Sequence, residues 1–243
     1  MIQTPVIVTF ANQKGGVGKT SLCVTFANYL VMKGVRVVVI DCDFQHSILK
    51  CRKADLKHYG EELIPYEVWS HEPNSSEAMI TLIEKLHNDP GIDVVLMDSP
   101  GSLKADGLVP MFVNSDIIAV PFHYDLVTVP STASFLMFLD RLRKAVGSRM
   151  KAQLFIIPNL HDNRVGKRTE LLLWDNTRDT FSNYGYVTFK RKATISWSDR
   201  CPLHRSGSWY PLPIRGWRCD CLPLLSGVYP VLDETSAADS LPG

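Results

Sequence analysis

The stretch ANQKGGVGKTS, residues 11–21, decides the fold because it joins a strand-like run to a helical one through a glycine-rich loop. The apolar run VIVTF precedes it at residues 6–10, and a helical pattern covers about residues 19–33. Glycines let backbone N–H groups turn inward around phosphate oxygens, and a helix that starts there presents its positive end. The stretch therefore predicts a nucleotide-phosphate site. Its predicted contacts are Gly15, Gly16, Val17, Gly18, Lys19, Thr20 and Ser21.

Two side chains of this loop carry most of its predicted chemistry. Lys19 would reach the β- and γ-phosphates, and Thr20 would give its hydroxyl to Mg²⁺. The loop departs from the strict G-x-x-x-x-G-K-[ST] pattern, because Gln13 stands where the first glycine should be and Lys14 adds a second lysine. A glycine-rich turn without ligand, with Lys14 as a solvated surface residue, is the alternative interpretation. The strand before the loop and the helix after it favour the phosphate site.

Apolar runs and helical patterns alternate along the chain. Strand-like runs occupy residues 6–10, 35–40, 92–98, 117–121 and 153–157, and helical patterns occupy 19–33, 76–88, 131–146 and 166–182. The strand-like runs are continuously apolar, which indicates strands covered on both faces. Strands separated by helices indicate an α/β fold with a doubly wound, mostly parallel sheet, helices on both faces and the P-loop NTPase type of site.

Aspartates follow two of the predicted strands. Asp41 and Asp43 come directly after VVVI, and Asp98 comes after VVLM. Ligands of open α/β sheets collect at the carboxyl ends of the strands, so these carboxylates should converge on the glycine loop. Mg²⁺ that bridges phosphates needs one or two carboxylates, usually through water. A lone aspartate at a strand end is often a helix cap, but three in this arrangement favour a metal-nucleotide site.

Composition limits the class of protein. The 243 residues are 45% hydrophobic and 21% charged, with a net charge of +1, as in an ordinary globular protein whose basic surface, if any, is local. The six cysteines form no C-x-x-C pair, which favours reduced thiols in a cytosol. No run approaches the roughly 18 apolar residues of a membrane span. We therefore expect a soluble, cytoplasmic protein without a membrane partner.

Three segments together carry a family resemblance. NQKGGVGKTS, VVIDCDFQ and VLMDSPG, in this order, resemble the ParA/MinD (SIMIBI-type) family of ATPases with a deviant Walker A loop. The resemblance covers about residues 4–200. VPFHYDLVTVPSTASF (120–135) and HDNR (161–164) also resemble the family's segments after the fourth and fifth strands. The NQ before Lys14 resembles the ParA side of the family.

The resemblance suggests what the second lysine does. Family members form a homodimer that encloses two ATP molecules with Mg²⁺. By resemblance, Lys14 would contact phosphates across the interface, and Lys19 those of its own subunit. A second cation stabilises charge on the phosphoryl oxygens and makes dimerisation depend on ATP.

The resemblance also assigns roles to the carboxylates. Asp43 would position the attacking water, Asp98 would support Mg²⁺ through water, and Asp41 would be a supporting carboxylate. Phe44 replaces the family's usual proline between Asp43 and Gln45. This departure predicts a looser turn and slower hydrolysis, with nucleotide binding unaffected.

Further implications concern partners. ParA-like proteins bind DNA non-specifically as ATP dimers, and a ParB-like centromere-binding partner stimulates hydrolysis during partition or maintenance of plasmid, chromosome or mobile DNA. We expect the protein to associate with the nucleoid. Basic residues cluster at 141–144, 149–151, 163–168 and 189–192, although such clusters also occur as solvated helix faces. The predicted DNA contacts are Arg164, Lys167, Arg191 and Lys192.

The end of the chain differs from the rest. Residues 201–243 hold six of the fifteen prolines and no lysine, and no helix-length periodic segment occurs there. We predict a ParA-like ATPase domain over 1–200 and an irregular, divergent tail over 201–243.

Other functions remain open at this point. A nucleotide-binding regulatory adaptor without efficient turnover would share the loop, and so would a MinD-like positioning ATPase. The latter would end in a basic amphipathic helix, whereas this chain ends in SAADSLPG. An iron–sulfur carrier would need bridging cysteines, and Cys219 and Cys221 lie in the predicted tail.

Overall fold

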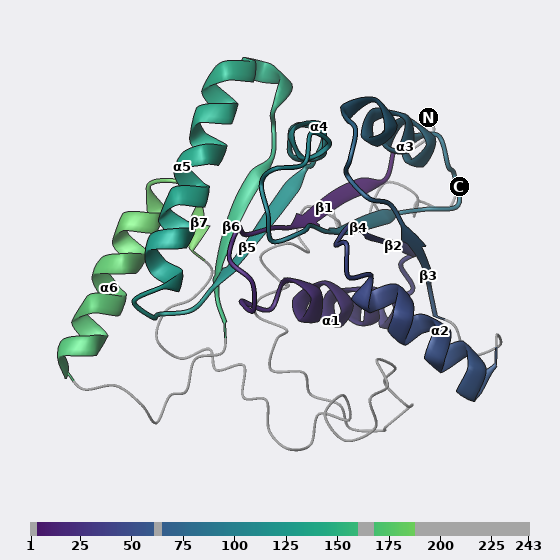
Figure 1. Ribbon diagram of the computed structural model, residues 1–243, viewed down its shortest axis with the longest axis horizontal. Helices are drawn as coiled ribbons and strands as arrows, with labels where there is room; N and C mark the ends of the chain where they lie inside the picture. Colours follow the sequence, from purple (N-terminus) through teal and green to yellow (C-terminus); the bar gives the residue numbers. More distant parts are fainter. Residues whose placement is uncertain (1–3, 61–64, 160–167, 188–243) are drawn as a thin grey trace, which may run out of the picture.

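The computed structural model describes residues 4–60, 65–159 and 168–187. Within these ranges, seven parallel strands form one sheet in the order β3-β2-β4-β1-β5-β6-β7 (Figure 1). The strands are β1 (Val6–Phe10), β2 (Val37–Asp41), β3 (Glu67–Ser70), β4 (Val94–Asp98), β5 (Ile117–Phe122), β6 (Gln153–Pro158) and β7 (Tyr186–Val187). The helices are α1 (Lys19–Met32), α2 (Ser47–Tyr59), α3 (Ser76–His87), α4 (Leu108–Val113), α5 (Thr128–Val146), the 3₁₀ turn η2 (Gly147–Arg149) and α6 (Arg168–Ser182).

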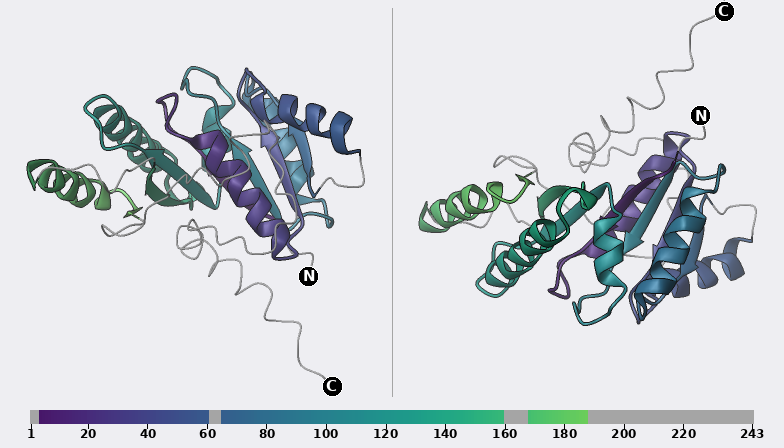
Figure 2. Two further views of the ribbon diagram at one scale, coloured as in Figure 1. Left: turned by 90° about the horizontal axis from the view of Figure 1, so that it is seen from below. Right: turned by 90° about the horizontal axis from the view of Figure 1, so that it is seen from above.

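Helices cover both faces of the sheet. Figure 2 shows α1 and α2 on one side and α3, α4 and α5 on the other, with α6 beside α5. Successive residues of β1 point to opposite faces, so Ile7 packs with Met79 of α3 and Phe135 of α5, whereas Val8 packs with Phe26 of α1. Two apolar cores therefore enclose the sheet, as its continuously apolar strands require.

The doubly wound α/β architecture confirms the fold class expected from the sequence. Each of the five predicted strands is present, and β2 and β4 begin two residues later than expected, at Val37 and Val94. β3, β7, α2 and α4 were not predicted, and α5 begins at Thr128 instead of residue 131. The boundary at residue 200 and the tail over 201–243 lie outside the described residues.

Strand register determines which side chains lie together at the carboxyl ends of the strands. Phe10 of β1 pairs with Asp98 of β4, and Asp98 pairs with Asp41 of β2. The three strands therefore end at one level, and the loop after β1 starts beside Asp98, with Asp41 one strand further along the sheet. In the described part of the chain, no helix combines the length and apolar character that a membrane crossing requires.

Candidate nucleotide-binding site

The glycine loop, residues 11–18, runs from the end of β1 to the first turn of α1. Gly16 and Gly18 have φ values of 80° and 92°, a left-handed conformation that L side chains rarely adopt. An added Cβ at Gly15 or Gly16 would meet no atom within 4 Å, so this part of the loop is open. The open space around Gly15 and Gly16 leaves room for an anion to approach the backbone amides closely.

The start of the loop is fastened to α5 by two amide side chains. Asn12 is buried, and its Nδ2 donates to Pro121 O (2.9 Å) and to Thr132 Oγ1 (2.8 Å). Gln13 Nε2 donates to Ser131 O at 2.8 Å. The residue that replaces the first glycine of the strict pattern therefore anchors the loop to the neighbouring helix.

The two lysines of the loop have different surroundings. Lys19 is only 7% exposed, and its Nζ lies 3.5 Å from the carbonyl oxygen of Lys14. Burial lowers the pKa of Lys19, while the charges of Asp98 and Asp43 act in the opposite direction. Lys14 is half-buried, and its backbone N–H donates to Asn12 Oδ1 at 3.2 Å. One cation thus faces the carboxylates beneath the loop, and the other sits on the loop itself.

Thr20 and Asp98 meet directly. Thr20 Oγ1 donates to Asp98 Oδ2 at 2.7 Å, although 78 residues separate them in the sequence. The pKa of Asp98 is raised to about 7, mainly by burial. The bond from Thr20 and the charge of Lys19 act against this rise, and the charges of Asp41 and Asp43 add to it. Asp98 Oδ1 is buried and has no hydrogen-bond partner within the described residues. The pair offers two oxygens suited to a hard cation.

Asp41 and Asp43 lie in the same region but bond differently. Asp41 is fully buried, and its Oδ2 accepts the backbone N–H groups of Ile48 and Leu49, both at 3.0 Å, in the first turn of α2. Burial raises the pKa of Asp41, and these backbone bonds lower it. Asp43 is half-buried in the β2–α2 loop, where its Oδ1 accepts the N–H of Gln45 at 2.9 Å. The structure thus gives Asp41 the capping role that the sequence analysis offered as the alternative to a metal-nucleotide site.

Sequence reasoning missed Asn159 and His123, which lie on the far side of the loop. Asn159, after β6, is 2% exposed, and its Nδ2 donates to Val17 O at 2.9 Å. An added Cβ at Gly18 would lie 2.2 Å from the same nitrogen. The pKa of His123, after β5, is lowered by burial. The charge of Asp125 and a bond with the Val17 backbone act in the opposite direction. Only the fold brings these residues to the loop.

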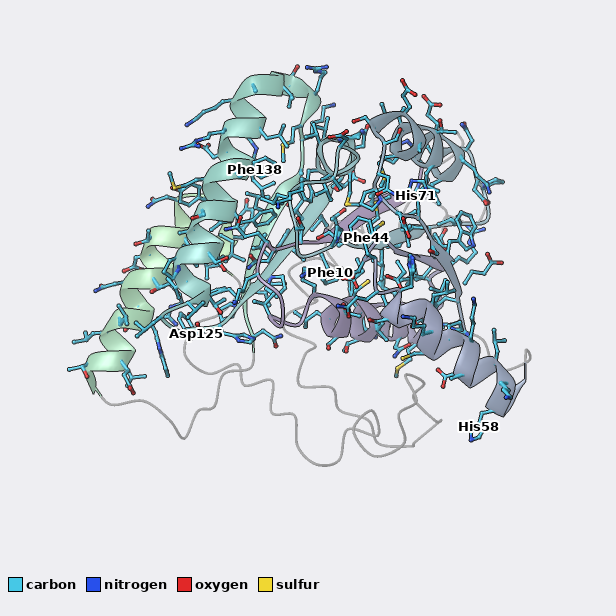
Figure 3. All side chains as sticks on the ribbon, in the orientation of Figure 1. Phe10, Phe44, His58, His71, Asp125 and Phe138 are labelled. Atoms are coloured by element: carbon cyan, nitrogen blue, oxygen red, sulfur yellow. The ribbon has the colours of Figure 1, made fainter. Side chains whose placement is uncertain are left out.

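The remaining predicted residues divide into described and undescribed ones. Val17 is buried, and Ser21 O accepts a bond from Thr25 Oγ1 at 2.7 Å inside α1. Phe44, labelled in Figure 3, is 49% exposed beside Asp43. The predicted DNA contacts Arg164, Lys167, Arg191 and Lys192 lie outside the described residues.

Other basic residues lie near the opposite end of the strands from the glycine loop. Arg141, Lys144, Arg149 and Lys151 are exposed at the end of α5 and just beyond it. Figure 1 shows α5 rising from the edge that holds the loop to this distant end. Lys144 pairs with Asp140 at 2.7 Å, so part of the local charge is compensated.

No group of three or more metal-binding side chains gathers in the described part of the chain. Mg²⁺ bound with a nucleotide is usually held by phosphates, waters and one or two carboxylates, so it does not require such a group. The geometry as a whole can cradle phosphates with backbone amides, neutralise them with lysines and seat a cation on Thr20 and Asp98.

Comparisons with known proteins agree with this geometry. The family model described as the CobQ/CobB/MinD/ParA nucleotide binding domain matches residues 8–173, more than half of the chain. The chromosome-partitioning ATPase Soj of Thermus thermophilus is 27% identical in an alignment 180 residues long, which covers 65% of this chain and 70% of the relative. Maintenance of carboxysome distribution protein A of Gloeobacter kilaueensis is 24% identical over 166 residues, 68% of each chain.

Solved structures share the fold. A plasmid partition protein from Borrelia burgdorferi superimposes with a TM-score of 0.55 at 22% identity, over 72% of this chain and 85% of the other. Cobyrinic acid a,c-diamide synthase from Mycobacterium smegmatis, with bound ADP and magnesium, gives a TM-score of 0.57 at 19% identity, over 72% and 82%. At identities this low, the likeness to these structures shows a shared fold and no more.

Proposed function

The chain belongs to the CobQ/CobB/MinD/ParA nucleotide-binding domain family, and we propose that it is a ParA-like ATPase whose homodimer closes around Mg-ATP, binds DNA non-specifically and is released by hydrolysis. The observation that carries the proposal is the loop with two lysines, Lys14 and Lys19, above the bonded pair Thr20 and Asp98. Relatives named for chromosome partitioning and carboxysome distribution support the choice of a ParA-like function.

The residues present fit ATP and Mg²⁺. The buried Oδ1 of Asp98 has no hydrogen-bond partner within the described residues. The pKa of this carboxyl group is about 7, and a nearby cation would stabilise its charged form. Thr20 and Asp98 would therefore hold Mg²⁺, Asp98 through water, and the amides of Gly15 to Gly18 would hold the phosphates. Bound Mg²⁺ would neutralise charge on the phosphoryl oxygens.

The chain's own residues would then divide the chemistry. Lys19, buried against Asp98, would bind phosphates within its subunit. Lys14 would reach across the dimer to the phosphates of the other subunit, where a cation stabilises the developing charge. Asp43 would orient the attacking water, and Asp41, as a supporting carboxylate, would act through the α2 cap that it forms. Phe44 lacks the fixed φ that a proline would give this turn, so slow turnover is part of the proposal.

DNA binding by this protein would be electrostatic. Exposed arginines and lysines on one surface neutralise phosphates without reading bases. Arg141, Arg149 and Lys151 offer such a surface within the described residues, in addition to the predicted contacts Arg191 and Lys192. A ParB-like centromere-binding protein would stimulate hydrolysis, and the protein would work in the cytoplasm on the nucleoid.

The test is hydrolysis of Mg-ATP by the full chain, with and without non-specific DNA, beside a Lys14→Ala variant. We expect slow release of phosphate by the wild type and ATP-dependent dimers in light scattering. Lys14→Ala should bind nucleotide with little change but lose both the dimers and at least roughly tenfold of the turnover. Nucleotide binding without any turnover, with DNA and partner present, would overturn the switch and favour a regulatory adaptor.

A further inference from the structure

The loop that carries Asp43, residues 42–46, ends at a strained residue. His46 has a φ of 48°, and it is the one non-glycine residue with positive φ in the part of the chain that the structure describes. This left-handed conformation is unfavourable for an L side chain because Cβ crowds the following carbonyl oxygen. His46 also directly precedes α2, and the N–H of Lys50 donates to its carbonyl oxygen at 2.9 Å. Other contacts must hold this backbone in place.

The imidazole of His46 supplies such contacts with both ring nitrogens. Nδ1 lies 3.1 Å from Ser70 Oγ, and Nε2 lies 3.2 Å from Glu72 Oε1. An imidazole protonated at Nε2 satisfies both contacts, since it accepts from the Ser70 hydroxyl and donates to Glu72. Glu72 is itself held by Asn74, whose Nδ2 donates to Oε2 at 2.8 Å. The side chain therefore bridges the loop to the segment after β3.

The same bridge fixes the backbone around Asp43. The N–H of His46 donates to Asp43 O, and that of Gln45 donates to Asp43 Oδ1, each at 2.9 Å. Beneath the loop, the ends of β2 and β3 are already joined, because Asp41 pairs with Ser70. The loop is thus held at its start by the sheet and at its end by the imidazole.

We propose that His46 is a positioning residue that, through Ser70 and Glu72, tethers the Asp43 loop and so sets where the Asp43 carboxylate lies. This role rests on the proposed function, since it assigns Asp43 to the attacking water. In this role His46 acts through the Asp43 loop and not by contacting the nucleotide. The His46–Glu72 pair is partly solvent-exposed, and such pairs add little to global stability. Variants of the tether should therefore fold.

The first measurement follows the tether without using activity. Hydrogen exchange of the full chain, without nucleotide, reports the amides of residues 45 and 46. His46→Gly removes the imidazole and tolerates positive φ, and Glu72→Ala removes its partner. Both variants should exchange these amides at least roughly fivefold faster than the wild type. Glu67→Ala, which removes a β3 carboxylate bonded to Trp69 instead of His46, is the matched control and should leave them unchanged.

The second measurement separates positioning from binding. His46→Gly and Glu72→Ala should each lower kcat roughly tenfold while KM for ATP changes less than about twofold. Glu72→Gln, which keeps an acceptor oxygen, should recover most of kcat, and the His46→Gly/Glu72→Ala double variant should be no slower than His46→Gly alone. Unchanged exchange and kcat in both single variants, or additive losses in the double variant, would overturn the tether. If the wild type showed no ATP hydrolysis but the variants still exchanged these amides faster, the tether would be upheld and the ATPase function rejected.

Discussion

Replacing Gly18 with alanine tests the packing of the glycine loop. The residue has φ 92°, and the new Cβ would lie 2.2 Å from Asn159 Nδ2. That nitrogen donates to Val17 O at 2.9 Å, so the buried amide must rotate and lose its bond. Left-handed backbone costs an alanine about 1–2 kcal/mol, and a buried amide left unsatisfied costs about 1–3 kcal/mol. These costs add to about 2–5 kcal/mol, and the stiffer unfolded chain of the alanine variant offsets up to about 1 kcal/mol, so we expect a net loss of about 1–5 kcal/mol.

Urea unfolding of the nucleotide-free full chain, followed by circular dichroism, measures this loss. Gly34→Ala is the matched control, because its φ is 82° and an added Cβ meets nothing within 4 Å. The same offset applies to the control, which should lose only about 0–2 kcal/mol. In the Gly18→Ala/Asn159→Ala double variant the collision is absent, so its loss should fall short of the sum of the single losses by about 1–2 kcal/mol. If Gly18→Ala were no less stable than Gly34→Ala and bound nucleotide as the wild type does, the contact with Asn159 would not exist.

Two further predictions concern charge. The folded-state pKa of Asp98 is raised from 3.8 to about 7, so the folded state binds the extra proton; the free energy of unfolding should fall as pH rises from about 4 to 7, by at most about 4 kcal/mol. Asp98→Asn should remove this decline in pH-dependent urea unfolding, and an identical slope in the variant would contradict the assignment. Reversing the charges of Arg149 and Lys151 should weaken binding to non-specific DNA at least roughly tenfold. The slope of log K against log salt concentration should fall by about two, because about two fewer counterions are released on binding. The same change at Arg191 and Lys192 compares the two surfaces, and a normal salt slope in either variant removes that surface from the DNA site.

The sequence predicted the parts of the fold that are buried on all sides. β1, β2, β4, β5 and β6 are continuous apolar runs, and each was found. β3 (Glu67–Ser70) is a four-residue edge strand with exposed ends, so it carries no such signal. α2 (Ser47–Tyr59) was missed because most of its residues are polar, and α4 (Leu108–Val113) because it is only six residues long and contains Pro110.

The start of α5 shows a local signal that was overlooked. Asp125 Oδ1 accepts the N–H groups of Val127 (2.9 Å) and Thr128 (2.6 Å), and Asp125 is labelled at this turn in Figure 3. Such a side-chain acceptor satisfies amides that a helix start leaves without partners. Pro130 then falls in the first turn, where its missing N–H costs nothing. The pattern D-x-x-T before a proline thus predicts a helix that begins at Thr128 rather than at residue 131.

The loop and its strand-end carboxylates could be predicted because each stands at the end of a continuous apolar run, namely β1, β2 and β4. The anchors of the loop were not, since Asn12 bonds Thr132 and Asn159 bonds Val17 over more than 100 residues. A polar residue alone does not reveal a partner so far away. Contacts of this kind follow only from the strand order, which places β5 beside β1 and β6 next to β5.

Asp41 and Asp98 show how much a site depends on bonds that residue type does not disclose. Both are buried, pair with each other in the register, and carry one oxygen without a hydrogen-bond partner in the described structure. If Asp41 turned toward a cation, two backbone amides of α2 would lose their acceptor in a buried place, at about 1–3 kcal/mol each. Asp98 would release only the hydroxyl of Thr20, which can rotate and bind the same cation. Asp98 is therefore the carboxylate that can change partners during a nucleotide cycle, and Asp41 holds the helix beside it in place.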